Sequence, residues 1–219
     1  MTLTEAMQAR HTVRKYTSAP LPAELISKLN DRIKENNQKH GVSIKLITGD
    51  EAVLGPLIKL ILAKGVKNYF LLAGSDTPEL GERLGCSSAD LMLYAQTLGL
   101  NTWWVGGTYS RKSAAEKAED NKVIGIVAVG YGVEQGKPHK SKAPEEVSSY
   151  EGEAPGWFRE GAKAALLAPT ALNKQAFFIK GHDVKVSITC DNGIFTGADL
   201  GLVKYHFELG AGIDNFEWE

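Results

Sequence analysis

The first half of the chain alternates between helical and strand patterns. A capping box in "TLTE" begins a short helix that ends near Arg10. Residues 22–41 predict a second helix, because apolar residues recur at helical spacing, Pro22 suits the first turn and Gly41 ends it. The apolar runs "VSIKLIT" and "KNYFLLAG" predict two strands, with a short helix near residues 57–63 between them.

A long helix, a buried strand and a polar segment follow. Residues 79–98 predict the helix, "TWWVGG" is a short extended piece, and a polar helix comes next. The run "KVIGIVAVGYG" is apolar, β-branched and ended by glycines, which is typical of a fully buried strand. Residues 134–156 are rich in Pro, Gly, Ser and charge, have no periodicity, and predict a linker. Beyond it we expect a helix in "WFREGAKAALLA", strands in "QAFFIKG" and "VKVSITC", and a last helix in "GADLGLVKYHFELGAG".

The two sides of this linker resemble one another. Each reads as helix, strand, strand and long helix, and within the long helices "SADL" with Asp90 matches "GADL" with Asp199. Chance similarity and a true internal duplication are equally open, and a real duplication would pack the halves about a pseudo-twofold axis. We therefore predict an α+β fold with an N-terminal half (1–133), a linker (134–156) and a C-terminal half (157–219).

The charge balance and the cysteines narrow the possible partners and location. The 219 residues include 25 Lys and Arg against 26 Asp and Glu, which excludes the broad positive field that nucleic acids and membrane surfaces require. Cys86 and Cys190 have no paired spacing, which favours a reducing, cytoplasmic location. The most apolar run, "PLIKLILA", is broken by Lys59, so we expect no membrane span. The five histidines show no metal spacing, and we interpret His206 as an ordinary helix residue.

The stretch "RHTVRKYT" gathers cationic side chains directly after the first predicted helix. Arg10 and Arg14 present planar forks that suit phosphate oxygens, and Thr12 adds a hydroxyl donor. The stretch could therefore bind a phosphate monoester. By itself, however, the basic end of a helix is the commoner explanation.

Two other stretches contain candidate ligand contacts. In "APTALNKQAFF", a proline and small residues precede Asn173 and Gln175, so a flat ring could approach the backbone and meet amides at its edge. In "GLNTWWVGG", Gly106 and Gly107 allow close approach of the backbone to a ligand. A helix stop and a simple turn are the plainer alternatives. A basic, solvated loop follows "GYG" and contains Lys137, His139, Lys140 and Lys142.

Taken together, these stretches are similar to the FMN-dependent nitroreductase family. "ARHTVRKYTSAPLPAELISKLN" resembles its N-terminal Arg-x-Ser/Thr-x-Arg/Lys-x-Phe/Tyr signature, and "APTALNKQAFF" resembles its Pro-Ser-x-x-Asn-x-Gln-Pro-Trp motif. "ADLMLYAQTLGLNTWWVGG" resembles its long helix and flavin-facing loop, and "GYG…KSK" resembles its late glycine and basic tail. The order differs, because the asparagine motif lies here in the second half. Ala176 and Phe177 also replace the motif's Pro and Trp.

This resemblance implies a nitroreductase-like fold with a mixed central sheet flanked by helices, and FMN as the cofactor. Family members build two flavin sites at a homodimer interface, so the apparent duplication implies one chain that imitates this dimer and holds one site. The resemblance also implies that Arg10 and Arg14, with Lys140 or Lys142, bind the phosphate and ribityl chain.

The remaining site residues are also implied by the resemblance. His11 and Thr12 would lie along the ribityl chain and the pyrimidine edge, and a backbone N–H of Gly106 or Gly107 would donate to flavin N5. The isoalloxazine would be lined by Pro169, Thr170, Ala171 and Asn173.

The implied activity is hydride transfer from NAD(P)H, through FMN, to a nitro-aromatic, a quinone or a similar flat small molecule. No catalytic side chain and no metal are required, because the chemistry belongs to the flavin. Two alternatives are a flavin-binding sensor or carrier without turnover, and a relative that kept the fold but lost the cofactor. We expect a monomer that imitates a dimer, or a homodimer, with no nucleic-acid or membrane partner.

Overall fold

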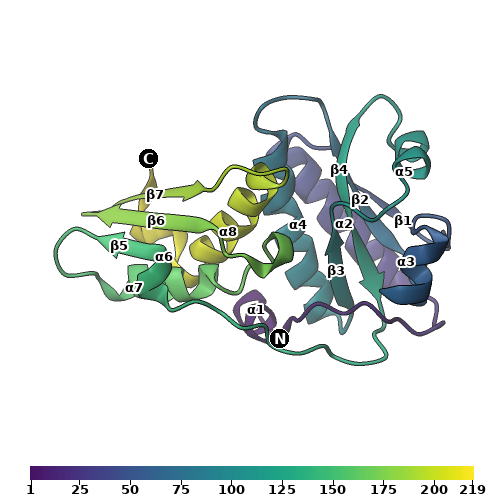
Figure 1. The fold of residues 1–219 in the computed structure, drawn as a ribbon, viewed down its shortest axis with the longest axis horizontal. Coiled ribbons are helices and arrows are strands. Elements are labelled where there is room, and N and C mark those ends of the chain that lie inside the picture. Colours follow the sequence, from purple (N-terminus) through teal and green to yellow (C-terminus); the bar gives the residue numbers. More distant parts are fainter.

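Two four-stranded sheets face one another across a pair of long helices (Figure 1). The computed structural model describes residues 1–219, apart from the side chains of Pro56, Leu57 and Leu60. The first sheet is antiparallel, in the order β1-β2-β4-β3, with β1 (Lys45–Ile47), β2 (Tyr69–Gly74), β3 (Asn101–Val105) and β4 (Lys122–Gly130). The second is mixed, in the order β5-β6-β7-β8, with β5 (Ser148–Tyr150), β6 (Phe177–His182), β7 (Lys185–Cys190) and β8 (Glu217–Trp218).

The helices agree closely with the sequence patterns. They are α1 (Leu3–Ala9), α2 (Ala23–His40), α3 (Pro56–Ile61), α4 (Leu80–Thr97), α5 (Arg111–Ala118), α6 (Pro144–Val147), α7 (Gly156–Ala165) and α8 (Thr196–Ala211), with short 3-10 turns η1 (Ala171–Asn173) and η2 (Ile213–Asn215). The capping box on α1 is confirmed, because the Thr2 hydroxyl accepts from Glu5 N–H and the Glu5 carboxylate accepts from Thr2 N–H. Gly41 ends α2 in the left-handed conformation, as predicted. The α+β class is therefore confirmed.

The prediction of one mixed central sheet is wrong. The α4–α8 pair lies between the two sheets, so their edges cannot join, and each sheet buries one face against these helices (Figure 1). One apolar core runs through the molecule, from Phe70 and Val127 of the first sheet, through Leu91 and Leu202, to Ile179 of the second. The range 134–156, predicted to be a linker, contains α6 and the strand β5, which pairs with β6.

Small residues allow α4 and α8 to touch closely along their backbones. A Cβ atom placed on Gly201 would lie 2.0 Å from the carbonyl oxygen of Glu82, and one on Gly85 would lie 2.3 Å from that of Ala198. These contacts are reciprocal, because each helix presents a glycine to the other helix near its own N-terminal end. They relate "GERLG" (81–85) to "GADLG" (197–201). Asp90 and Asp199, which the sequence comparison matched, are not equivalent in this contact.

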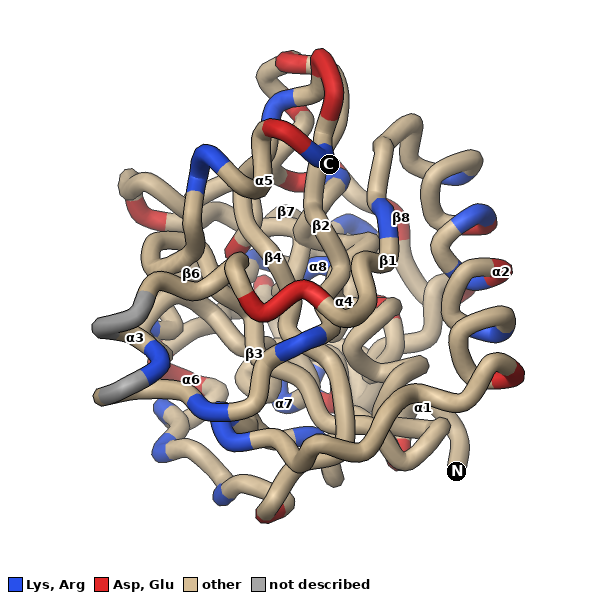
Figure 2. The backbone as a smooth tube through the Cα atoms, turned by 90° about the vertical axis from the view of Figure 1, so that its right-hand side faces the viewer, with Lys and Arg blue, Asp and Glu red and all other residues tan. Residues whose placement is uncertain are grey.

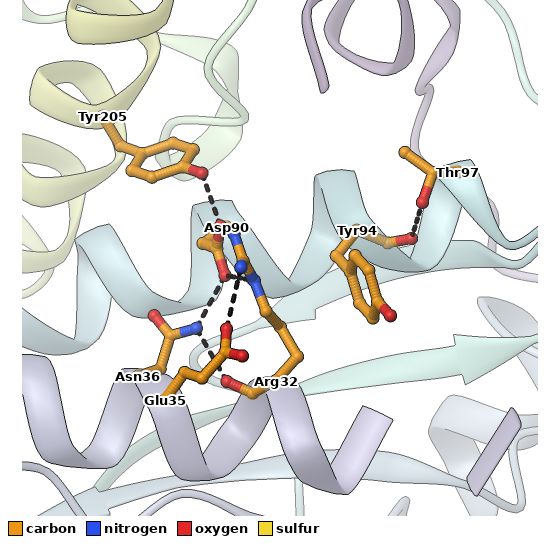
Figure 3. Close-up of polar contacts among 7 residues, drawn as sticks. All are labelled: Arg32, Glu35, Asn36, Asp90, Tyr94, Thr97 and Tyr205. Atoms are coloured by element: carbon orange, nitrogen blue, oxygen red, sulfur yellow. Dashed lines mark hydrogen bonds and ion pairs between the residues drawn. The ribbon is translucent and has the colours of Figure 1, made fainter. Parts of the chain in front are cut away.

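Asp90 ties α2, α4 and α8 together (Figure 3). Its carboxylate is buried and accepts from Arg32 Nε at 2.7 Å, from Arg32 Nη2 at 2.6 Å and from Asn36 Nδ2 at 2.6 Å. The hydroxyl of Tyr205 on α8 also donates to it. Every oxygen lone pair of this carboxylate therefore has a donor, which is the condition for burying a charge at little cost.

Charged residues of both signs are interspersed along the backbone, as α2 shows clearly (Figure 2). Within the described part of the chain, no helix has both the length and the apolar character needed to cross a membrane.

Candidate functional site

The strand β3 lies at the centre of the candidate site. Because side chains alternate along a strand, Thr102 and Trp104 share one face and point toward the core that contains α4 and α8. Trp103 and Val105 point into a second apolar cluster on the opposite face. The motif "RHTVRKYT" joins the edge of this strand, because Val13 N–H donates to Thr102 O at 3.1 Å. The sequence motif is thus held beside β3.

Arg10 is a buried cation that has no partner in the described part of the chain. It ends α1, where its backbone N–H donates to Ala6 O, and its side chain is only 5 % exposed. Among the described residues, no carboxylate or hydrogen-bond acceptor contacts its guanidinium, and Nε is fully buried. Burial lowers the pKa of Arg10 to about 10. An unpaired buried charge costs several kcal/mol, so this geometry fits a site that takes an anion.

The charge of Arg10 acts on two histidines, His11 and His206, and His139 acts on the same two. Burial first, and then the positive charges of Arg10 and His139, lower the pKa of His11. His206 on α8 is completely buried, and the same causes lower its pKa to about 3. Sequence reasoning placed His139 in a basic, solvated loop and interpreted His206 as an ordinary helix residue, and it assigned neither to the site. The burial of His206 depends on how α1 and α8 pack, and only the position of His139 within a basic loop could have drawn attention to it.

The hydrogen bonding of His206 fixes its tautomer. Nδ1 lies 2.8 Å from Leu202 O, an acceptor, so Nδ1 must carry the proton. In the neutral ring, Nε2 is then a lone-pair acceptor, and it is buried without a partner. The described residues contain no group of three or more His, Cys, Asp or Glu side chains that could hold a metal ion.

Residues 135–142, here called the strap, connect the N-terminal motif to the "APTALNKQAFF" segment. Figure 1 shows this part of the chain passing beneath the molecule, beside the N-terminal segment. Gln135 Oε1 accepts from Asn101 Nδ2 at 3.0 Å, and Gly136 lies directly against His11. Gly136 has a φ of 74° and no space for a Cβ, so only glycine fits there. The strap therefore begins in contact with the Arg10 motif.

The strap ends on the asparagine motif. Asn173 Nδ2 donates to Lys140 O at 2.8 Å, and His139 Nε2 lies 2.9 Å from Leu166 O at the end of α7. Lys142 donates from its backbone N–H to Gln175 Oε1 at 2.8 Å and from Nζ to Gln175 O at 2.9 Å. Two motifs far apart in the sequence are thus connected by one short segment.

Gln175 is an anchor of this connection and not an exposed ligand contact. It is 1 % exposed, its Oε1 accepts from the strap, and its Nε2 donates to Leu166 O at 2.9 Å. Leu172, Asn173 and Gln175 all have φ between 48° and 53°, which is unfavourable for residues other than glycine. Such strain persists only where the surroundings hold the backbone, and it is common at functional sites.

The other predicted residues of this segment lie around η1. Pro169 is half-buried, and the buried Thr170 accepts from Gln175 N–H through its hydroxyl at 3.1 Å. Ala171 N–H donates to Asp199 Oδ1 at 2.9 Å, which fixes η1 to the first turn of α8. Burial raises the pKa of Asp199.

The two arginines of the N-terminal motif have separate environments. Arg14 is exposed, and its guanidinium lies 5.5 Å from the centre of the Trp103 ring. Trp103 is on the face of β3 opposite Thr102 and Trp104. Arg14 therefore lies against the opposite face of β3 from Thr102 and Trp104.

Gly106 follows β3 beneath two aromatic rings. A Cβ on Gly106 would lie 2.4 Å from the Phe195 ring and 2.6 Å from that of Trp104, and these rings meet edge to face. A hollow of about 200 Å³ begins here, lined in part by Tyr109, Arg111 and Phe195. Gly107 has open space around it. A larger hollow, about 330 Å³, lies elsewhere, near Tyr16 and Lys67, and Arg10 does not line it.

Several buried polar atoms of the Arg10 motif and β3 have no hydrogen-bond partner among the described residues. Arg10 Nε, Thr102 Oγ1 and Trp104 Nε1 are all buried without a hydrogen bond. Thr102 pairs with Thr12 near Arg10, and Trp104 covers Gly106. Native proteins satisfy nearly all buried polar atoms, so these exceptions make the Arg10 motif and β3 the candidate ligand site.

The family described as "Putative TM nitroreductase" matches residues 2–211. The chain belongs to this nitroreductase family. Comparison with the curated proteins gives no match.

Solved structures show the same fold. A "putative nitroreductase" from Thermotoga maritima is 17% identical, with a TM-score of 0.71, over 96% of this chain and 83% of that one. Two others, each called a "putative nitroreductase in complex with FMN", come from Desulfovibrio desulfuricans (17% identical, TM-score 0.50) and Exiguobacterium sibiricum (14%, 0.53). Each covers 67% of this chain, which itself covers 95% of each of them. The resemblance read from the sequence is confirmed for the nitroreductase family and fold.

Proposed function

We propose that this nitroreductase-family protein is an FMN-dependent oxidoreductase that uses NAD(P)H to reduce a nitro-aromatic, a quinone or a similar flat acceptor. The observation that carries the proposal is Arg10, a buried guanidinium with no anion among the described residues. Two structural relatives crystallised in complex with FMN make a flavin phosphate the natural anion for it.

The residues present fit such a cofactor. Arg10 would bind the phosphate, with His11 and Thr12 beside the ribityl chain, and the unpartnered atoms along β3 would meet polar groups of the cofactor. Pro169, Thr170, Ala171 and Asn173 would line the ring. Arg14, Lys140 and Lys142 remain part of this proposal as outer cations, although Lys142 Nζ already donates to Gln175 O.

FMN, when bound, supplies the hydride-accepting and hydride-donating chemistry. The protein's part is to bind, orient and exclude water. A backbone N–H of Gly106 or Gly107 would donate at flavin N5, and Phe195 and Trp104 would shield Gly106 from solvent. The hollow of about 200 Å³ beside Gly106 would admit the flat part of the co-substrate or acceptor.

We further propose that the chain imitates the dimer of its family. The reciprocal glycine contacts of α4 and α8 support a pseudo-twofold relation between residues 1–133 and 157–219, with 134–156 connecting them. The Arg10 side of the site would then come from the first half and the Asn173 side from the second. A monomer with one site is expected, although a homodimer is compatible with it. The free thiols of Cys86 and Cys190 support a cytoplasmic location.

The absorption spectrum of the purified protein tests this function. With FMN added and excess removed, bound oxidised flavin should give bands at about 370 and 450 nm, which NADPH or NADH should bleach without oxygen. Bands that persist with both nicotinamides would indicate a flavin carrier or sensor. Failure to take up FMN would indicate a relative that lost its cofactor. Riboflavin, which lacks the phosphate, is the matched control and should bind more weakly.

A further inference from the structure

We infer that His206 shares one proton with the phosphate of the bound cofactor, so that each FMN brings one proton into the protein from solvent. This inference rests on the proposed function, and it assigns a role to a residue that no sequence motif singles out. No covalent bond of FMN breaks or forms. The proton taken from solvent ends between a phosphate oxygen and His206 Nε2.

Two buried polar atoms on packed elements have no partner among the described residues. Arg10 Nε follows α1, His206 Nε2 lies on α8, and α1 packs against both α4 and α8. The charge of Arg10 acts directly on the titration of His206, as does that of His139, which places the three groups in one electrostatic environment. A buried polar atom without a partner is uncommon, and two neighbouring ones indicate a missing common partner.

The two atoms have opposite hydrogen-bonding character. Arg10 Nε–H can only donate. His206 Nε2 can only accept, because Nδ1 carries the ring proton and donates it to Leu202 O. The missing partner must therefore accept from Arg10 and offer a hydrogen to His206. A phosphate dianion offers only acceptors, so it would place lone pairs against Nε2 unless one proton is added.

The charges around His206 favour this proton only when an anion is present. Without an anion, Arg10 and His139 both oppose a charged His206. The carboxylates on the helices packed against α8 already have partners: Glu5 accepts from Thr2 N–H, Glu82 pairs with Lys204, Asp90 with Arg32, and Glu160 with Lys163. On α8 itself, Asp199 accepts from Ala171 N–H and Glu208 accepts from Trp218 Nε1. A bound phosphate would be the uncompensated negative charge in this environment.

The consequence is a pH-dependent affinity of defined form. A phosphate monoester loses its second proton with a pKa of about 6, so free FMN is a dianion above that pH. If the complex holds one extra proton, the Kd of FMN rises about tenfold per pH unit from pH 7 to 8.5. Below about pH 6 the free phosphate already carries the proton, and this contribution to the slope disappears.

The experiment measures FMN affinity by quenching of flavin fluorescence between pH 6 and 8.5, with riboflavin as the matched probe. We expect the tenfold slope for FMN and none for riboflavin. Calorimetry at pH 7.5, in two buffers with different ionisation enthalpies, should give an uptake of about one proton per FMN. This second measurement needs no variant, so it stands even if a substitution at His206 prevents folding.

Two variants separate His206 from its neighbour. His206→Gln offers an amide donor that requires no proton, so FMN should bind with a Kd that changes less than twofold over pH 7 to 8.5. His139→Gln is the control and should keep the slope. Tight FMN binding with neither slope nor proton uptake in the wild type would overturn this inference while leaving the flavin function intact. Absence of FMN binding at every pH would overturn both.

Discussion

Arg10 and Arg32 are the same side chain in opposite situations. Arg32, on α2, binds Asp90 through two N–H groups and also contacts Glu35, while 30% of its side chain remains exposed (Figure 3). Arg10 is far more buried and has no acceptor among the described residues. The hydrogen bonds to Asp90 raise the pKa of Arg32, whereas burial lowers the pKa of Arg10.

This difference distinguishes a structural charge from a binding charge. The Arg32 network satisfies its own members and holds three helices together, so it needs no ligand. The free-energy cost of burying Arg10 is not offset within the chain, which is expected where stability has been given up for a binding site. Substitutions in the Asp90 network test the structural role of Arg32.

Removal of the Asp90 carboxylate should have the largest effect. In Asp90→Ala, Arg32, Asn36 and Tyr205 lose a common acceptor, and we expect the free energy of unfolding to fall by about 3 kcal/mol. Urea denaturation of the protein without FMN measures this. Glu35→Gln, which removes only an exposed contact of Arg32, is the control and should change stability by less than about 0.5 kcal/mol. A loss below about 1 kcal/mol in Asp90→Ala would remove the contrast between the two arginines.

The close contact of α4 and α8 supports both the Arg32–Asp90 network and the Arg10 site. Gly201→Ala would force a methyl group against the Glu82 carbonyl, so we expect a loss of about 2 kcal/mol from overpacking. Gly156→Ala is the control, because nothing lies within 4 Å of its added Cβ. Equal stability of these two variants would show that the helices separate easily, and the site geometry could not then depend on their contact.

Acid should destabilise the side of the molecule that contains Arg10. His206 has a folded-state pKa of about 3, below the unfolded value of about 6.5, so the unfolded chain binds more protons between these limits. The contribution of His206 to stability without FMN is therefore fully present above about pH 6.5. It is lost as the pH falls, by at most about 1.4 kcal/mol per pH unit.

Urea denaturation at pH 7 and pH 5 measures this loss. His206→Gln should lose less stability over the same interval, because the variant has no imidazole to protonate. His11 and His40, whose pKa values are also lowered, contribute equally to both proteins. If His206→Gln lost as much stability between pH 7 and pH 5 as the wild type, burial would not be lowering the pKa of His206.

Local patterns predicted most of the elements but not their assembly. Helical spacing, the Thr2 cap and Gly41 give α1 and α2 nearly to the residue, because these signals are local. The strand β5, "SSY", has no apolar alternation and forms because the edge of β6 offers it backbone partners. The division into two sheets likewise depends on where α4 and α8 pack, which no local pattern encodes.

Only those residues of the candidate site that lie in recognisable motifs could be predicted from the sequence. Arg10, Thr12, Gly106 and Asn173 stand in recognisable stretches, whereas His206 lies in an unremarkable helix and acquires its environment through contacts distant in sequence. The alignment of the two apparent repeats could also be determined only from the structure. "SADL" and "GADL" are similar as letters, but the helices meet through "GERLG" and "GADLG".

The most direct test exchanges each arginine for methionine and measures FMN affinity and stability together. Arg10→Met should weaken FMN binding by about 1 kcal/mol or more, the contribution of a charge-assisted hydrogen bond. Its stability without FMN should rise, because the cost of burying an unpaired charge is removed. Arg32→Met should instead lose stability and keep its FMN affinity, because it leaves the Asp90 charge buried without its cation. Unchanged FMN affinity in Arg10→Met would contradict the central claim that this buried guanidinium is there to bind an anion.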